Sequence, residues 1–215
     1  MKLSSKRILL SLMLVSSSAG LFAQKLDKAK DLLERKKIPE AQAEIDNVVA
    51  QEKQKNNAEA WYVRGKIYGT IASDSTKATS VPNAKDIALE SLKKYMELES
   101  QVKDTSKRFL LLTMDNRRPI TDLYSNYSKE AASYYNAGNY NDALKGFQSS
   151  LSIFDLLSKQ GWTGGITLDT ISVLYAGISA EKASKLDTAA QYYGKIAEAK
   201  AKAQGYESIY KWLAD

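Results

Sequence analysis

The amino-acid sequence predicts an all-α fold, and three observations carry that prediction. Only three prolines and 11 glycines occur among 215 residues, so little interrupts a helix. Several segments place apolar residues at intervals of three and four, most clearly between Ala143 and Phe154. Good helix formers (Ala, Leu, Lys, Glu and Gln) fill most of the positions between them.

Residues 1–23 are predicted to be a secretory signal peptide, with cleavage after Ala23. An apolar stretch, residues 8–15, is followed by small and polar residues. This stretch is well short of the roughly 20 residues that span a bilayer, so cleavage is favoured over an uncleaved membrane anchor. No later segment is apolar enough to span a membrane. We therefore expect an exported protein, periplasmic or associated with the cell envelope. The charged start of the signal consists of Lys2, Lys6 and Arg7.

Composition excludes several kinds of chemistry. The chain has no Cys and no His, which removes disulfides, thiolate and imidazole metal sites, cysteine nucleophiles and Ser-His-Asp triads. The formal charge is +6, and removal of the signal's three basic residues would leave 28 basic against 25 acidic residues. Lys and Glu are interspersed, as on solvated helix faces. We therefore expect no cofactor, no metal and no nucleic-acid partner.

Prolines and one glycine suggest where helices begin and end. Pro39, Pro82 and Pro119 each precede a segment of helix formers. Proline is favoured at a first helical position, where its missing N–H would have no intrahelical partner. Gly138 is predicted to end a helix, since glycine tolerates the left-handed conformation found just past many helix ends.

A spaced pattern recurs along the chain. In residues 58–68, Trp61, Gly65 and Tyr68 stand at intervals of four and three, and Ala88 and Leu92 follow in the next predicted helix. Residues 138–147 form a turn and the start of a helix carrying Ala143 and Phe147 at the same spacing. The other positions of the pattern are Tyr127, Ala131 and Tyr134; Gly177, Ala189 and Tyr193; Pro39, Ala41 and Ile45; and Tyr210, Leu213 and Ala214.

This pattern resembles the tetratricopeptide repeat family, although Arg64 stands where that family usually has Leu. The resemblance implies a right-handed superhelix of antiparallel helix pairs, an α-solenoid, because neighbouring pairs must stack to bury their apolar faces. Gly65 and Gly177 would permit close helix approach. The repeat boundaries implied are 24–57, 58–98, 120–157 and 168–203, with a partial repeat at 207–215.

Two stretches lengthen the repeat beyond its usual size of about 34 residues. Residues 72–80 have the composition of a loop. Residues 109–112 form an apolar run that we interpret as an extension of packed helix, and residues 116–119 as a turn. The partial last repeat is expected either to continue in a longer chain or to pack as a cap.

Two other segments were weighed as chemical sites. Residues 161–165 are rich in glycine but lack the phosphate-loop pattern and a preceding strand, which favours a turn between helices. Arg117 and Arg118 could clamp a carboxylate or a phosphate, although adjacent arginines in a turn are more often solvated. No pair of carboxylates stands out as a glycosidase site. We therefore predict that the protein is not an enzyme.

The resemblance also suggests which residues line a concave groove for a peptide. Leu174 and Ile178 have an alternative, because the last helix could cover them. The expected function is a protein–protein interaction scaffold of the bacterial cell envelope. The alternatives are a structural portion of a larger envelope assembly and a helical protein that binds glycans through exposed Tyr and Trp. The predicted groove residues are Tyr62, Lys66, Ser128, Tyr135, Leu174, Ile178 and Glu181.

Overall fold

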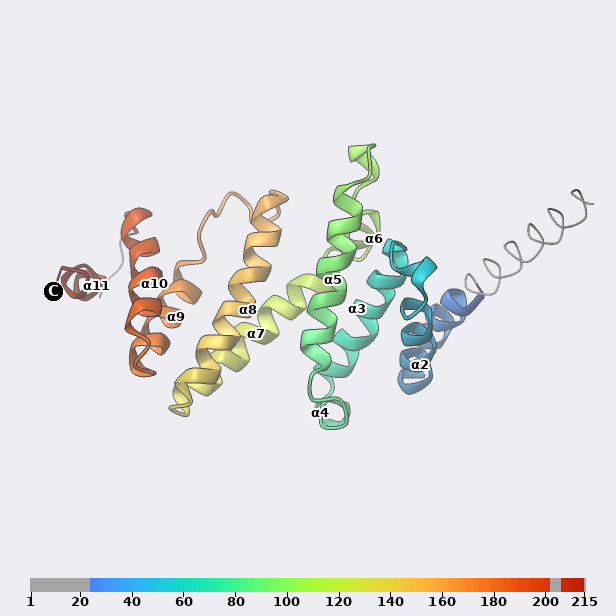
Figure 1. Cartoon of the computed structure of the whole chain (residues 1–215), viewed down its shortest axis with the longest axis horizontal. Coiled ribbons are helices and arrows are strands. Elements are labelled where there is room, and N and C mark those ends of the chain that lie inside the picture. Colours follow the sequence, from blue (N-terminus) through green and yellow to red (C-terminus); the bar gives the residue numbers. More distant parts are fainter. Residues whose placement is uncertain (1–23, 202–205, 215) are drawn as a thin grey trace, which may run out of the picture. The chain divides into compact units, whose positions relative to one another are not determined.

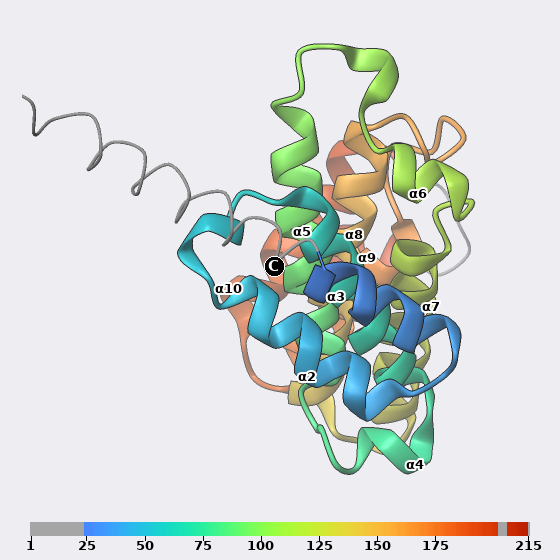
Figure 2. The same cartoon turned by 90° about the vertical axis from the view of Figure 1, so that its right-hand side faces the viewer.

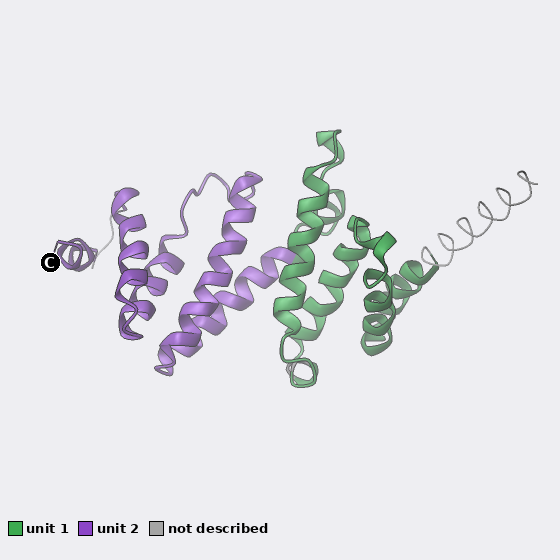
Figure 3. Ribbon diagram, in the orientation of Figure 1, with its two compact units in different colours: residues 1–119 green, residues 120–215 purple. Residues whose placement is uncertain are grey.

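The computed structural model describes residues 24–201 and 206–214. The described residues form helices and turns without any strand, which confirms the predicted all-α class. The chain divides into two compact units, Met1–Pro119 and Ile120–Asp215 (Figure 3). The predicted signal peptide lies outside the described residues.

Unit 1 is built from helices that pack on their neighbours in the chain. The helix at residues 24–34 lies beside α2 (Figures 1 and 2), where Lys28 Nζ pairs with Glu44 Oε1 at 2.5 Å. α3 packs against both α2 and α5. After residues 24–34, the helices are α2 (Ile38–Val49), α3 (Ala58–Ser73), α4 (Ser75–Ala78), α5 (Ala84–Ser100) and α6 (Leu110–Met114), with short 3-10 turns at Glu52–Gln54 and Thr105–Lys107.

Close packing of α3 on α5 depends on Gly65. A Cβ at this position would lie 2.7 Å from Leu92 Cγ, which is nearer than real Cβ atoms come to other groups. Leu92 is fully buried, so it has little room to retreat. The prediction that Gly65 permits close helix approach is therefore confirmed.

Arg64 joins three helices of unit 1. Its Nε donates to Asp46 Oδ1 on α2 at 2.9 Å, and Nη1 donates to Ser91 Oγ on α5 at 3.0 Å. Its guanidinium also lies 4.9 Å from the ring centroid of Tyr68, whose hydroxyl donates to Asp46 Oδ2 at 2.6 Å. A polar network therefore stands where the family pattern has an apolar leucine.

Two predictions for the lengthened stretches need correction. Residues 72–80 are not simply a loop, because α3 continues to Ser73 and α4 adds a helical turn. Residues 109–112 do not extend a packed helix. Phe109 is left-handed (φ 59°), and its N–H donates to Glu99 Oε2 at 2.7 Å. This geometry separates α6 from α5 and buries Phe109 and Leu112 while Leu110 stays exposed.

Unit 2 repeats the arrangement of consecutive packed helices. α8 approaches α7 closely at Gly146, where a Cβ would lie 2.8 Å from Ala131 Cβ. α9 packs against both α8 and α10 (Figure 1). None of the helices in the described part of the chain combines the length and apolar composition needed to cross a bilayer. The helices are α7 (Arg118–Asn136), which begins just before the unit boundary, α8 (Tyr140–Lys159), α9 (Thr170–Lys182), α10 (Leu186–Glu198) and α11 (Glu207–Trp212).

The turns of unit 2 follow the glycines. Gly138 has φ 77°, and the N–H of Asn139 reaches back to Tyr134 O at 2.9 Å, which confirms Gly138 as the end of α7. Gly161 (φ 69°) ends α8 in the same way, and residues 161–165 form the predicted turn.

The prolines mark helix starts less uniformly than expected. Pro39 and Pro119 are second residues of α2 and α7, whereas Pro82 lies two residues before α5 begins at Ala84. Its expected role as a first helical residue is therefore wrong. Asn83 occupies the N-cap position between Pro82 and the helix.

The core of unit 2 includes residues of α11. Tyr206 and Ile209 are buried in the same cluster as Val173 and Ile196. The ring of Trp212 meets the ring of Tyr193 edge-on, with centroids 5.1 Å apart. The segment predicted as a partial repeat therefore packs on the apolar core through side chains three residues apart, Tyr206, Ile209 and Trp212.

Candidate functional site

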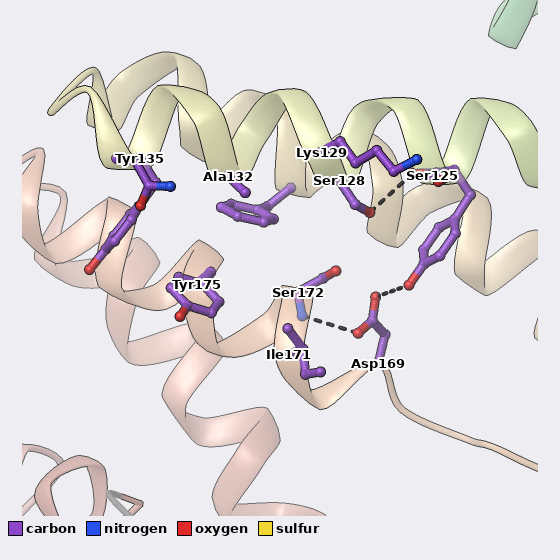
Figure 4. A pocket seen from close by; sticks show the side chains of 12 residues that line it. Ser125, Ser128, Lys129, Ala132, Tyr135, Asp169, Ile171, Ser172 and Tyr175 are labelled. Atoms are coloured by element: carbon purple, nitrogen blue, oxygen red, sulfur yellow. Dashed lines mark hydrogen bonds between the residues drawn. The ribbon is translucent and has the colours of Figure 1, made fainter.

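A pocket of about 370 Å³ opens between α7 and α9 in unit 2 (Figure 4). It has a polar end at the start of α9 and an aromatic end one and a half turns further along that helix. Its lining comprises Tyr124, Ser125, Ser128, Lys129, Ala132, Tyr135, Asn136, Phe147, Asp169, Ile171, Ser172 and Tyr175.

Asp169 anchors the polar end. It is the N-cap residue of α9, and its Oδ1 accepts from the backbone N–H of Ser172 at 3.0 Å. Its Oδ2 accepts from the hydroxyl of Tyr124 on α7 at 2.6 Å (Figure 4). Asp169 is only 9% exposed, and both donors are neutral. Within the described residues, Asp169 forms no ion pair.

The surroundings of Tyr124 raise the pKa of its hydroxyl. Burial and the hydrogen bond to the Asp169 carboxylate raise the pKa of Tyr124 to about 12. The phenol therefore stays protonated and keeps donating to Asp169 across the ordinary pH range. The pair joins α7 to the start of α9 and fixes the direction of the carboxylate.

The aromatic end is formed by three neighbouring rings. Tyr135 and Tyr175 meet edge-on with centroids 5.1 Å apart, and Phe147 stacks on Tyr175 at 5.8 Å. Phe147 is buried, whereas Tyr175 is 37% exposed. Ile171, one turn before Tyr175 on α9, is 67% exposed. The pocket therefore offers an aromatic wall that remains partly in water.

Two predicted groove residues do line this pocket. Ser128 and Tyr135 both come from α7 and point toward the space between α7 and α9 (Figure 4). The Ser128 hydroxyl donates to Tyr124 O at 3.0 Å. The ring of Tyr135 lies against Tyr175. Burial, and to a smaller extent the nearby Tyr140 hydroxyl, raises the pKa of the Tyr135 hydroxyl.

Tyr62 is not available to a peptide, so its assignment to a groove is wrong. Its side chain lies in the core of unit 1 and is 4% exposed. The hydroxyl donates to Asp115 Oδ2 at 2.5 Å and contacts Leu111 O at 3.0 Å. Half-buried Lys66 pairs with the same Asp115 oxygen at 2.6 Å. Together they fasten α3 to α6 and the turn that follows α6.

The three predicted residues of α9 lie outside the pocket lining. Leu174 and Ile178 are half-buried and pack against the apolar core cluster of unit 2, which includes Ile209 of α11 and Tyr206 just before it. Glu181 accepts a hydrogen bond from the buried Tyr193 hydroxyl at 2.6 Å. These side chains therefore stabilise unit 2, in line with the alternative that Leu174 and Ile178 are covered.

Sequence reasoning missed Tyr124, Asp169, Phe147 and Tyr175. One local signal was available for Asp169, because an Asp directly before an apolar helical run is a typical N-cap. No such signal existed for Tyr175. α9 carries apolar residues on all of its faces, so the spacing of apolar residues does not show that Tyr175 faces outward while its neighbour Leu174 packs on the core.

Neither arginine of the pair after α6 lines the pocket. Arg117 is left-handed (φ 62°) and half-buried, and Arg118 is exposed at the start of α7. Across residues 24–201 and 206–214, no group of three or more acidic side chains comes together in a way that would hold a metal ion.

Comparison with protein-family models finds no matching family, and comparison with curated proteins finds no significant match. The candidate site therefore rests on its own geometry.

Proposed function

We propose that this protein is an exported, tetratricopeptide-like repeat scaffold that binds a segment of a partner protein in the α7–α9 pocket of unit 2. The observation that carries the proposal is the partly exposed aromatic and aliphatic wall formed by Tyr135, Tyr175 and Ile171. Burying an apolar side chain of a partner there is worth about 1.5–3 kcal/mol. A peptide with several side chains in contact would bind measurably.

The repeat assignment draws support from local packing. Consecutive helices pack in pairs, and Gly65 and Gly177 occupy matching places where a second helix comes within contact distance. In a solenoid of this kind, first helices of neighbouring repeats line one face. α7 and α9 are the first helices of two consecutive pairs, so a ligand site between them fits that architecture.

A binding role, rather than catalysis, is favoured by the contents of the pocket. Hydrolysis of glycosides generally needs two carboxylic groups, and Asp169 is the one carboxylate in this lining. It already accepts hydrogen bonds from Tyr124 and Ser172.

The charged start and short apolar run of residues 1–23 support export to the cell envelope.

The test is to purify the protein from the cells that produce it and to select the peptides that bind it from a library of random short peptides. Tyr175→Ser removes the partly exposed ring of the wall, and Leu186→Ser removes an exposed apolar side chain that lies outside the pocket on α10. Peptides that bind the wild type and Leu186→Ser, but lose binding to Tyr175→Ser, are the expected result.

Three other results would overturn the proposal. Equal binding to both variants would locate the peptide site elsewhere. Enrichment on an envelope glycan array with no peptide selected would favour a glycan-binding protein. Neither peptide nor glycan binding would favour a structural role in a larger assembly.

A further inference from the structure

We infer that the α7–α9 pocket selects a partner segment carrying a basic side chain, which seats on Asp169, and an apolar side chain two or three positions away, which packs on the Tyr175 wall. This inference rests on the proposed function and specifies its ligand. It commits to the chemistry of the partner: an extended peptide with one Lys or Arg close to one aromatic or aliphatic residue.

The carboxylate of Asp169 has unused hydrogen-bonding capacity. An ionised carboxylate offers about four acceptor positions, and the two hydrogen bonds from Tyr124 and Ser172 occupy two of them. Both donors are neutral, so the buried negative charge has no cation beside it in the described chain. A buried charge without a counter-ion is unfavourable, and a cationic ligand group would relieve that cost.

The position of Asp169 makes it a better anchor than Lys129. Lys129 also lines the pocket, but its side chain is exposed. Charges in water are strongly screened, whereas buried charges are screened much less. The field inside the pocket is therefore dominated by the carboxylate. Lys129 at the rim would favour an acidic or neutral group beside the basic one, rather than a second basic residue.

The length of the pocket sets the spacing of the two anchors. Asp169 and Tyr175 are six residues apart along α9, a rise of about 9 Å. An extended peptide advances about 3.3–3.6 Å per residue, so side chains two or three positions apart span about 7–11 Å. A basic residue on Asp169 therefore brings the side chain at the second or third following or preceding position to Tyr135 and Tyr175.

The role of Asp169 in its own helix allows a clean variant. Asp169→Asn retains a side-chain oxygen for the Ser172 N–H, since Asn caps helices as well as Asp does. It removes the charge and leaves the wall unchanged. Asp155→Asn is the matched control, because it removes one exposed carboxylate of α8 outside the pocket.

The probes are two synthetic peptides, acetylated and amidated to remove terminal charges: Gly-Arg-Gly-Phe-Gly and Gly-Arg-Gly-Gly-Phe-Gly. Each peptide has two control versions. In one, citrulline, a neutral isostere of Arg, replaces Arg, and in the other Glu replaces it. Fluorescence anisotropy at low salt measures binding to the wild type and both variants. We expect the better Arg peptide to bind about tenfold tighter than its citrulline version, as for one charge-assisted hydrogen bond. Asp169→Asn should abolish this preference, and Asp155→Asn should keep it.

Several results would overturn the inference. These are equal affinity for Arg and citrulline, a preference for Glu, an Arg preference that survives Asp169→Asn, or no binding by either Arg peptide. If peptide selection still yields ligands that depend on Tyr175 but carry no basic residue, the proposed function stands and only the charge assignment fails. If selection yields no peptide either, both fail.

Discussion

Gly177 on α9 lies directly against the ring of Tyr193 on α10. A Cβ built on Gly177 would stand 2.5 Å from Tyr193 Cε1 and 2.7 Å from Cδ1. The ring is also fastened to α9 through its hydroxyl, which donates to Glu181 Oε2, one turn after Gly177, at 2.6 Å. The α9–α10 contact in unit 2 therefore depends on the absence of a side chain at one position.

Gly177→Ala should lower the free energy of unfolding by about 1–2 kcal/mol, since overpacking outweighs the gain in helix propensity. Gly194→Ala is the control, because a Cβ there would meet nothing within 4 Å beyond the nearby backbone of α10 itself. That change should stabilise by up to about 1 kcal/mol. Urea unfolding followed by circular dichroism measures both, and similar effects of the two substitutions would contradict the packing account.

Arg64→Leu should destabilise unit 1 by about 1–3 kcal/mol even though Leu is usual at this place in the resembled family. Asp46 and Ser91 would both lose a donor in a partly buried network. Arg35→Leu serves as the comparison, because Arg35 is exposed and pairs with Asp31 on one helix face. It should cost less than about 0.5 kcal/mol. Thermal unfolding of both proteins checks this, and a more stable Arg64→Leu protein would refute it.

Asp115 should contribute to stability at neutral pH and lose that contribution in acid. Burial opposes ionisation of Asp115, but hydrogen bonds from Lys66 and Tyr62 outweigh it and lower the pKa of the carboxyl. Because the folded-state pKa lies below the unfolded value of about 3.9, the stabilisation is present above that pH. It is lost as pH falls through the folded pKa. The stability gap between the wild type and Asp115→Asn should therefore narrow in acid, and a constant gap would count against this ion pair.

Tyr124 should have the opposite pH dependence. Its folded-state pKa of about 12 lies above the unfolded value of about 10. The associated stability is fully present below about pH 10 and is lost as pH rises toward 12. Unfolding of the wild type and Tyr124→Phe at neutral and alkaline pH measures the difference, which should shrink at alkaline pH. A stability difference that stays constant with pH would mean that the surroundings of Tyr124, including Asp169, do not raise the pKa of its hydroxyl.

The two roles of Asp169 should separate in stability measurements. Asp169→Ala removes the cap of α9 and should cost about 1 kcal/mol. Asp169→Asn keeps one oxygen for the Ser172 N–H but loses the charged oxygen that accepts from Tyr124, so it should cost less than Asp169→Ala but more than nothing. Chemical unfolding of the three proteins tests this. Equal losses for Ala and Asn would show that the charge itself stabilises α9.

Sequence reasoning named two of the twelve residues that line the candidate site, Ser128 and Tyr135. The resemblance to the tetratricopeptide pattern pointed to them, and both lie on α7, an amphipathic helix whose polar face stays out of the core. The same reasoning failed at Tyr62. α3 is apolar on most of its surface and lies between α2 and α5, so a repeat position that faces a groove elsewhere faces the core of unit 1 here.

The sequence by itself determined the helices, the turns at Gly138 and Gly161, and the positions where Gly65 and Gly177 admit a neighbouring helix. These features depend on hydrogen bonds and sterics within a few residues, so local composition records them. Only the tertiary structure brought Tyr124 to Asp169, which lie 45 residues apart in the chain. Their meeting depends on how α7, α8 and α9 pack, and packing is decided by many weak contacts between helices that no single segment encodes.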